Sequence, residues 1–364
     1  MQLQELKLQN FRNFFEKKLR FAQRNLICGK NGSGKTNLLE GIHLACTGKS
    51  FRGLQNRDFF LDKHKPASLF VRFAGEKTKT ISQSLILQAQ NSVGELKKEF
   101  FRDGKKIPIV KFLGKFPVIL FAPEELRLVW GTPKDQRAIL DLLVTQFEPT
   151  HALKLLKLLK VLRQRNKLLF IIGAGHAQKK ELAFWDQEFL SVGTEIIWQR
   201  NKVIVELNQH LSACYQDISG TKDQLELILD SSAGVEISEQ NKKKIQDLFA
   251  KKLTANLSLD LKNLFTNTGP HRDEPRLFLN GRAISNFASR GEGRTAVLAF
   301  KFAQKAFFEE SLGKNKILFL LDDAFSELDK DRAEYLLNNL GAEQSIFTAT
   351  EATKNLSDFQ IIKL

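Results

Sequence analysis

The stretch Leu26-Ile27-Cys28-Gly29-Lys30-Asn31-Gly32-Ser33-Gly34-Lys35-Thr36 joins a short apolar run to the pattern G-x-x-x-x-G-K-[S/T], which it matches at every fixed position. The residues that follow place apolar side chains at helical spacing, namely Leu38, Leu39, Ile42 and Ala45. A strand, a glycine-rich turn and a helix in this order are the context in which the pattern forms a phosphate-binding loop. The stretch therefore predicts an α/β fold with a nucleotide site between the strand and the helix.

Each fixed residue of the predicted loop has a chemical reason. The glycines allow backbone N–H groups to surround phosphate oxygens, and the positive end of the following helix points at the same place. Lys35 is expected to bring its ammonium group to the β and γ phosphates, and Thr36 to bind Mg²⁺. We expect the nucleotide to contact Gly29, Lys30, Asn31, Gly32, Ser33, Gly34, Lys35 and Thr36.

Two carboxylates follow an apolar run near the C-terminus, in Ile317-Leu318-Phe319-Leu320-Leu321-Asp322-Asp323. A buried strand that ends in Asp can bring that carboxylate to the metal ion beside a phosphate loop, so Asp322 is expected to bind Mg²⁺. Asp323 is expected to orient or deprotonate the water that attacks the γ phosphate. The predicted catalytic residues are Lys35, Asp322 and Asp323. The alternative for the pair of carboxylates is a solvated acidic turn.

A second anion-binding turn, Ser289-Arg290-Gly291-Glu292-Gly293-Arg294-Thr295, precedes a helical pattern and resembles the signature of ABC ATPases. Because the chain's own loop already holds its phosphates, Ser289, Gly291 and Glu292 are expected to contact the nucleotide of a second copy. Two copies would then enclose two nucleotides. Ser326 and Asp329 fall where the class has its D-loop. The alternative for Ser289 is a purely structural helix cap.

The composition is that of a folded basic protein. The 364 residues include 56 Lys and Arg against 41 Asp and Glu, a net charge of +15, and 42% are hydrophobic. Such a surplus of positive charge attracts polyanions, and nucleic acid is favoured over an anionic membrane because no amphipathic or lipidation signal accompanies it. A basic enzyme without a nucleic-acid partner is the alternative. The 30 Phe residues are assigned to the core rather than to base stacking.

Cysteine usage and hydropathy indicate the compartment. Cys28, Cys46 and Cys214 stand far apart, with no CxxC pair, so neither a disulfide framework nor a zinc site is expected. The first residues carry no apolar leader, and the apolar runs are far shorter than the roughly 18 residues that span a bilayer. We therefore expect a cytoplasmic protein with no membrane partner.

The order of the patterns suggests how the domains are organised. Strand-like runs fill the first 125 residues and return near the C-terminus, whereas helical patterns dominate between them. Thr132-Pro133-Lys134-Asp135 predicts a capped helix start. Apolar stripes from Leu153 to Leu169 and from Leu182 to Leu211 predict an antiparallel helical hairpin, which either projects or packs within a second domain. We expect one α/β lobe built from both termini and interrupted by a helical lobe.

The chain resembles the RecF family of SMC-like ABC ATPases along its whole length. Besides the phosphate loop, the motifs that carry the resemblance are Leu8-Gln9-Asn10-Phe11-Arg12-Asn13-Phe14, Lys49-Ser50-Phe51-Arg52, Pro123-Glu124-Glu125-Leu126, Gly269-Pro270-His271-Arg272-Asp273, and Asp322-Asp323 leading into Ser326-Glu327-Leu328-Asp329. The resemblance implies an ABC-type ATPase head lobe, a mixed sheet with helices, formed by residues 1–125 and 266–364. It implies an inserted α-helical arm lobe at residues 126–265.

The resemblance also implies a function. The chain would be a weak, DNA-stimulated ATPase with ATP and Mg²⁺ as cofactors, and hydrolysis would serve as a switch. With ATP bound, two copies would form a homodimer around double-stranded or gapped DNA. Slow hydrolysis would then release the DNA. RecR and RecO would be its partners in loading RecA, during repair, replication and the SOS response. By position, Arg12 would add a nucleotide contact. His271 and Arg272 are either structural links or residues that contact nucleotide or DNA.

Two departures from the family pattern concern this function. Arg290 and Glu292 stand where the family usually has Gln, which affects the strength of the contact in trans. Asp323 is shorter than the Glu that most ABC ATPases use, so we expect slow turnover, which suits a clamp better than a motor. Two alternative functions stay open: an ATPase subunit of a membrane transporter, and a structural DNA-binding protein with a vestigial nucleotide site.

Overall fold

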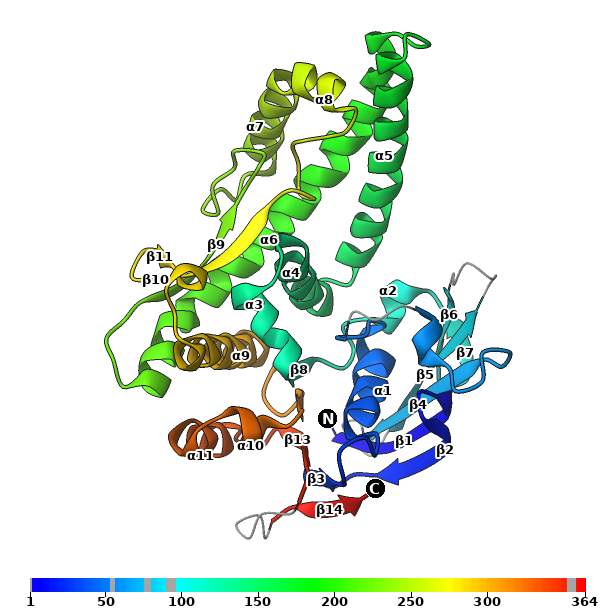
Figure 1. Cartoon of the computed structure of the whole chain (residues 1–364), viewed down its shortest axis with the longest axis vertical. Coiled ribbons are helices and arrows are strands. Elements are labelled where there is room, and N and C mark those ends of the chain that lie inside the picture. The colour runs from blue at the N-terminus through cyan, green and yellow to red at the C-terminus, as the bar shows by residue number, and fades with distance from the viewer. Residues whose placement is uncertain (1, 53–55, 75–79, 90–95, 352–357) are drawn as a thin grey trace. The chain divides into compact units, whose positions relative to one another are not determined.

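The computed structural model describes residues 2–52, 56–74, 80–89, 96–351 and 358–364 (Figure 1). The chain forms two compact units. The first consists of residues 1–126 and 300–364, and the second of residues 127–299. Within the described ranges, no helix is long and apolar enough to cross a membrane.

An antiparallel sheet forms one part of the first unit. Its strands are β1 (Gln2–Phe11), β2 (Phe14–Arg20), β4 (Ala67–Ala74), β5 (Thr80–Ala89), β6 (Leu96–Arg102) and β7 (Lys105–Ile107). They lie in the order β2-β1-β4-β5-β6-β7. A tight turn at Asp103-Gly104 joins β6 to β7, and both residues have a positive φ, 48° and 76°.

A parallel sheet forms the other part of the first unit. Its strands are β3 (Arg24–Cys28), β8 (Val118–Phe121), β12 (Leu318–Leu321), β13 (Gln344–Ala349) and β14 (Gln360–Lys363), in the order β14-β3-β13-β12-β8. The remaining elements of this unit are α1 (Lys35–Thr47), η1 (Asn56–Phe59), α2 (Ile109–Phe112), η3 (Pro123–Leu126), α10 (Ala324–Glu327) and α11 (Lys330–Asn339). Strands from both ends of the chain therefore build one sheet.

Helix α1 is the centre of the first unit, because it contacts strands of both sheets. Its apolar residues Leu38, Leu39 and Ile42 are fully buried. Gly41 allows the helix to approach β1, since a Cβ there would lie 2.9 Å from the side chain of Leu8. The phosphate loop therefore leads directly into a helix that is packed in the core of this unit.

The second unit is mainly helical. Its elements are α3 (Arg127–Trp130), α4 (Pro133–Phe147), α5 (Thr150–Gly173), η4 (Lys179–Glu181), α6 (Leu182–Ser219), β9 (Leu225–Asp230), α7 (Lys242–Ala255), α8 (Leu257–Asn263), β10 (Glu274–Leu279), β11 (Arg282–Ala283), η5 (Ile284–Asn286) and the start of α9 (Arg290–Leu312). The predicted hairpin of two long helices is confirmed by α5 and α6, which lie side by side (Figure 1). They share an apolar core with α7. The largest side chains of this core include Phe189 of α6 and Phe249 of α7.

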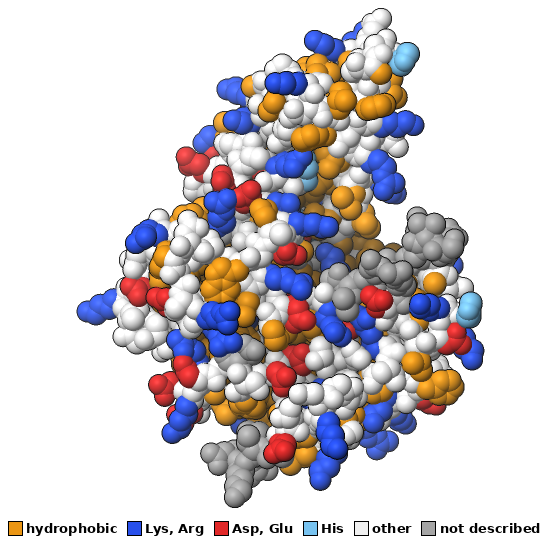
Figure 2. Space-filling model, in the orientation of Figure 1, with side chains coloured by type: hydrophobic (Ala, Val, Ile, Leu, Met, Phe, Trp, Pro, Cys, Tyr) orange, Lys and Arg blue, Asp and Glu red, His pale blue; other side chains and the backbone are white. Residues whose placement is uncertain are grey.

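Helix α5 has an unusual composition for a surface helix. It carries six Lys and Arg and no Asp or Glu, and Leu153, Leu156 and Leu159 on it are 46–61% exposed. Figure 2 shows Lys, Arg and hydrophobic side chains mixed along this part of the surface. The helix therefore contributes to the basic character of the chain.

The predicted α/β class is confirmed, and two details differ from the sequence-based expectation. The head contains two separate sheets, one antiparallel and one parallel. Strand β9 lies in the stretch expected to be helical, and there Leu225, Leu227 and Leu229 alternate at a period of two residues. Because β10 pairs with β9, residues up to 299 belong to the second compact unit, whereas the sequence-based boundary is at 265.

Candidate nucleotide-binding site

The predicted phosphate loop connects β3 to α1 and is shaped by its glycines. Gly34 has φ of 104°, and a Cβ at Gly29 would lie 2.6 Å from the Ser33 hydroxyl. Lys35 is buried, and its Nζ donates to the carbonyl oxygens of Gly29, at 2.7 Å, and of Lys30, at 3.2 Å. The lysine ammonium therefore lies inside the curve of the loop, where a phosphate would meet it.

A cavity of 590 Å³ opens beside this loop in the first unit. Its lining residues are Arg12, Asn13, Asn31, Gly32, Gly34, Lys35, Thr36, Asn37, Arg52, Asp58, Leu61 and Asp323. The lining is polar and combines three cations with two carboxylates. A polyanionic ligand with a bound cation suits such a lining.

The two residues predicted to bind the metal lie together. The Thr36 hydroxyl donates to Asp322 Oδ2 at 2.8 Å, although 286 residues separate them in sequence. A second hydroxyl, that of Thr348 at the end of β13, donates to Asp322 Oδ1 at 2.7 Å. Burial raises the pKa of Asp322, and the neighbouring Asp323 raises it further, whereas the two hydroxyl donors lower it.

Asp323 combines a left-handed backbone conformation with a buried carboxylate oxygen. Its φ is 49°, a left-handed conformation that is uncommon outside glycine, and its backbone N–H donates to the Thr348 hydroxyl at 2.9 Å. The buried Oδ1 atom of Asp323 has no hydrogen-bond partner among the described residues. A buried carboxylate oxygen without a partner beside a phosphate loop is available to a water molecule or a metal ion.

These observations fit Mg²⁺. The ion prefers oxygen ligands and usually takes one or two protein groups together with phosphate oxygens and water. Thr36 Oγ1 and Asp322 Oδ2 supply the two protein oxygens side by side, and Asp323 adds an oxygen that no described residue bonds. Thr36 and Asp322 are therefore the residues that would hold the ion.

Arg12 is held by a carboxylate that sequence reasoning missed. Glu40 of α1 is fully buried and accepts from Arg12 Nε, at 2.9 Å, and from Arg12 Nη2, at 2.6 Å. The remaining Nη1 donates to the carbonyl oxygen of Asp58 at 2.7 Å. Arg12 lines the cavity, and its three donor nitrogens each have a protein acceptor. A contact between Arg12 and nucleotide stays a prediction.

Glu40 also organises the loop that follows α1. The hydroxyl of Ser50 donates to Glu40 Oε1 at 2.5 Å, and Arg52 Nη1 lies 3.9 Å from Glu40 Oε2. Arg52 Nη1 donates to Asn37 Oδ1 at 2.9 Å. One buried carboxylate thus fixes two arginines of the cavity, and both belong to motifs that carry the family resemblance.

The predicted signature residues lie in the second unit. Ser289 is exposed, and its hydroxyl accepts from the backbone N–H of Glu292 at 3.2 Å, while the Glu292 carboxylate accepts from the backbone N–H of Ser289 at 2.8 Å. This reciprocal capping box starts α9, and the bond from Ser289 holds the pKa of Glu292 below its ordinary value. Gly291 lies in the first turn of the helix, where Thr295 donates to its carbonyl oxygen. Contact with a second copy stays a prediction.

The predicted D-loop residues follow directly after Asp323. The backbone N–H of Ser326 donates to the carbonyl oxygen of Asp323 at 3.0 Å. Asp329 caps α11, because its Oδ1 accepts from the backbone N–H of Arg332 at 3.0 Å. Both residues are exposed, so within the chain they shape a turn and a helix start.

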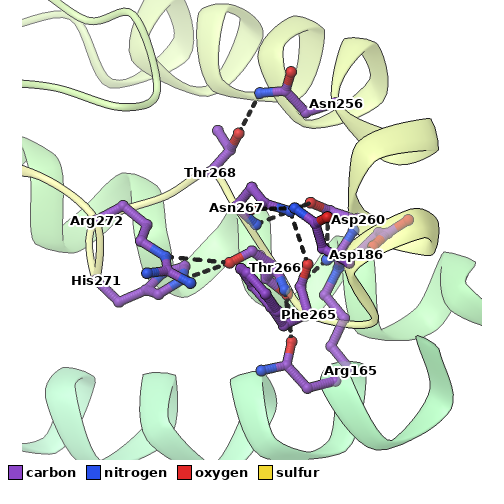
Figure 3. Close-up of polar contacts among 12 residues, drawn as sticks. Arg165, Asp186, Asn256, Asp260, Phe265, Thr266, Asn267, Thr268, His271 and Arg272 are labelled. Carbon is purple, nitrogen blue, oxygen red and sulfur yellow. Dashed lines mark hydrogen bonds and ion pairs between the residues drawn. The ribbon is translucent and has the colours of Figure 1, made fainter. Parts of the chain in front are cut away.

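His271 and Arg272 lie within the second unit, and Figure 3 shows both directed at the backbone of Thr266. Burial lowers the pKa of His271 to about 4, so the ring is neutral near pH 7, and its edge packs against Phe189. The neighbouring Asp273 is buried and accepts from Arg200 Nη1 at 3.3 Å. These contacts support a structural role for the motif.

Sequence signals for the missed residues are weak but identifiable. Glu40 lies among the apolar positions of α1, so a charged residue there needs a buried partner. Thr348 lies near the end of β13, where apolar side chains give way to polar ones. Neither signal indicates which cation or carboxylate is the partner.

Comparisons with known proteins agree with this geometry. The model of the RecF/RecN/SMC N terminal domain matches residues 2–353. The DNA replication and repair protein RecF of Alkaliphilus oremlandii is 32% identical over 98% of this chain and 96% of its own length. The RecF of Caldanaerobacter subterraneus subsp. tengcongensis is 34% identical over 96% of this chain and 94% of its own length.

Solved structures give the same result. A structure of the recombination mediator protein RecF-ATP in the RecFOR pathway is 31% identical and superposes with a TM-score of 0.88, over 99% of this chain and 95% of the other. The Smc head domain of Pyrococcus furiosus shares the fold, with a TM-score of 0.51 at 15% identity. The fold predicted from the resemblance, an ABC-type head of the SMC kind, is thus confirmed, and the chain belongs to the RecF family.

Proposed function

We propose that the chain is an ATP-binding protein of DNA replication and repair, with the ATP site between β3 and α1. The observation that carries the proposal is the cluster beside the phosphate loop. In it Thr36 is bonded to Asp322, and next to them lies a carboxylate oxygen of Asp323 that has no hydrogen-bond partner among the described residues. The names of the relatives support it, and so does the similarity of the whole chain to the solved RecF-ATP structure.

The residues of the site divide the work of slow ATP hydrolysis. The loop amides and Lys35 hold the β and γ phosphates. Thr36 and Asp322 would hold Mg²⁺, which would neutralise charge on those phosphates. Asp323 holds the attacking water and accepts its proton. Thr348 keeps both carboxylates in place, because its hydroxyl bonds the side chain of one and the backbone of the other.

The finer parts of the function belong to the same proposal. Two copies dimerise on ATP, with Ser289, Gly291 and Glu292 of one copy against the nucleotide of the other, and Ser326 and Asp329 near the same junction. The dimer holds duplex or gapped DNA, hydrolysis releases it, and RecO and RecR act with it to load RecA in the cytoplasm. The head built from both termini carries the helical arm as an insertion. The net charge of +15 and the exposed position of Ser289 support these steps.

The experiment is to size the protein with and without ATP and a 30-base-pair duplex. We expect a dimer only with ATP, tighter duplex binding in that state, and loss of both in Lys35→Ala. Asp323→Asn should keep the ATP-dependent dimer and lose turnover, because it removes the proton acceptor and leaves the phosphate ligands. Dimerisation and duplex binding of Lys35→Ala equal to those of the unchanged protein would contradict the proposal.

A further inference from the structure

The antiparallel sheet of the first unit has one face that no described element covers. Helix α1 packs on the inner face, where Leu69, Val71 and Phe73 of β4 are buried. Side chains alternate along a strand, so the residues between them, Phe70 and Arg72, lie on the opposite face. We call this opposite face, defined by the two rows of residues below, the outer face.

The pairing register aligns one row of side chains across all six strands of the outer face. Directly paired residues share a face. The row runs Lys18, Lys7, Phe70, Ser84, Phe101, Lys106. A second row beside it runs Arg20, Glu5, Arg72, Ser82. Six strands about 4.8 Å apart make the first row about 24 Å long.

The two rows are strongly basic. They hold five Lys and Arg against the single carboxylate of Glu5, and the side chains of Lys7, Lys18, Arg72 and Lys106 are 44–62% exposed. Glu5 is buried and lies 3.1 Å from both Lys18 Nζ and Arg72 Nη1. It therefore anchors the cations in an ordered array while leaving the rows with a net positive charge.

Aromatic rings stand among these cations. Lys7 Nζ and the Arg72 guanidinium lie 5.1 Å and 5.5 Å from the centre of the Phe70 ring. Phe101 lies two strands away in the same row, and both rings are half-buried. The next row carries Glu16 at one edge and Glu99 toward the other, so acidic groups border the basic strip. Lys106 also pairs with Glu99, at 2.7 Å.

We propose that the outer face binds a single nucleic-acid strand, with backbone phosphates on the cations and bases against Phe70 and Phe101. Unpaired bases can stack on aromatic rings of a flat sheet, whereas a duplex keeps its bases inside and offers phosphates only. An acidic protein segment would satisfy the cations without using two rings in one row. The inference rests on the proposed DNA function and names the surface that takes the unpaired strand of a gap.

The test measures binding of fluorescein-labelled dT15 and of a 15-base-pair duplex by anisotropy, without nucleotide. The double variant Phe70→Leu/Phe101→Leu should weaken dT15 binding about tenfold and change duplex binding less than twofold, because it removes only stacking. Lys18→Glu/Arg72→Glu should weaken dT15 binding more than tenfold and lower its salt dependence. Lys330→Glu, an exposed lysine on α11, is the control and should match the unchanged protein.

Several outcomes would overturn the inference. One is dT15 affinity of the double Phe variant within twofold of the unchanged protein. Another is that the same variant loses dT15 binding and duplex binding equally. A third is that poly-glutamate displaces labelled dT15 as effectively as unlabelled dT15 does. Binding of a fluorescent ATP analogue checks that each variant is folded. Lys35→Ala distinguishes failure of the proposed function from failure of this inference. We expect this variant to lose ATP-dependent duplex binding, which tests the ATP site, and to keep dT15 binding, which tests the outer face.

Discussion

Glu40 shows how a single residue can organise the nucleotide cavity from beneath it. The carboxylate is fully buried. Ion pairs with Arg12 and Arg52 and a hydrogen bond from the Ser50 hydroxyl stabilise its negative charge. A buried charge without a partner is costly, so removal of one partner from such a cluster costs about 3–5 kcal/mol.

We predict that Glu40→Gln destabilises the protein by at least about 2 kcal/mol, because it leaves the buried Arg12 guanidinium without its counter-charge. ATP affinity should fall as well, since Asp58 and Arg52 are positioned by the same cluster. Urea unfolding and titration with a fluorescent ATP analogue measure the two effects. Glu226→Gln, at an exposed position of β9, is the matched control; equal behaviour of the two variants would contradict this role.

Two buried histidines predict acid sensitivity. Burial lowers the pKa of His43 and of His271 to about 4, below the ordinary value of 6.5. The folded state therefore binds fewer protons than the unfolded chain, so stability is full above pH 6.5 and falls as the pH drops toward 4. Between pH 7 and pH 5 each histidine should lower the free energy of unfolding by about 2 kcal/mol. His271→Gln should show a shallower pH dependence of the unfolding free energy; an unchanged slope would count against this origin.

Among the elements, the start of α9 has a feature that the sequence did not predict. Glu292, which is proposed to contact the nucleotide of a second copy, also belongs to the capping box of this helix. The Glu292 carboxylate bonds the backbone N–H of Ser289, which places a negative charge at the helix terminus that would face a partner's triphosphate. Sequence alone places Glu292 in the signature and does not reveal this bond.

We predict that Glu292→Gln strengthens ATP-dependent dimerisation severalfold, since glutamine can still accept the capping bond without repelling phosphate. Helix stability should change by less than about 1 kcal/mol. Analytical ultracentrifugation with ATP measures the dimerisation constant, and Ser289→Ala should act in the opposite direction. Weaker dimerisation of Glu292→Gln would refute the contact in trans.

The start of α4 allows a prediction about stability alone. Thr132 and Asp135 form a capping box, and Pro133 occupies the first turn. Thr132→Ala should lower the free energy of unfolding by about 1 kcal/mol, and Thr132→Ser should restore most of it. Thermal unfolding of the two variants checks this; equal melting temperatures would show that the cap is not needed.

The elements also show where sequence patterns are reliable. The phosphate loop and the helix start at Thr132 were predictable because each depends on residues close in sequence. The pairing of β8 with β12 joins segments about 200 residues apart, and no local pattern reports such a contact. The same reason hides Thr348 and Glu40, whose roles arise only when distant segments meet.

At the scale of the whole molecule, the charge of +15 makes a prediction about DNA affinity. Neutralising even four phosphates releases enough counter-ions to weaken duplex binding about 100-fold between 50 and 200 mM salt. A plot of the logarithm of the dissociation constant against that of the salt concentration measures the number of contacts. A flat plot would exclude a binding mode dominated by phosphate contacts.

The family and the α/β class were predictable from motifs. The boundary of the second compact unit was not, because β9 and β10 pair across a stretch of about 45 residues that contains two helices. The assignment of Ser289 to a partner's nucleotide stays a prediction.

The position of α1 between two sheets makes the melting behaviour of the head a measure of ligand occupancy. A nucleotide bound at the start of this helix is coupled to the core of residues 1–126 and 300–364, because the same helix holds that core together. The unfolding temperature of this unit should therefore rise with ATP concentration, because binding adds RT ln(1 + c/Kd) to the free energy of unfolding, where c is the concentration of free ATP. Calorimetry of the unlabelled protein would then serve to rank nucleotides and inhibitors without an assay of turnover.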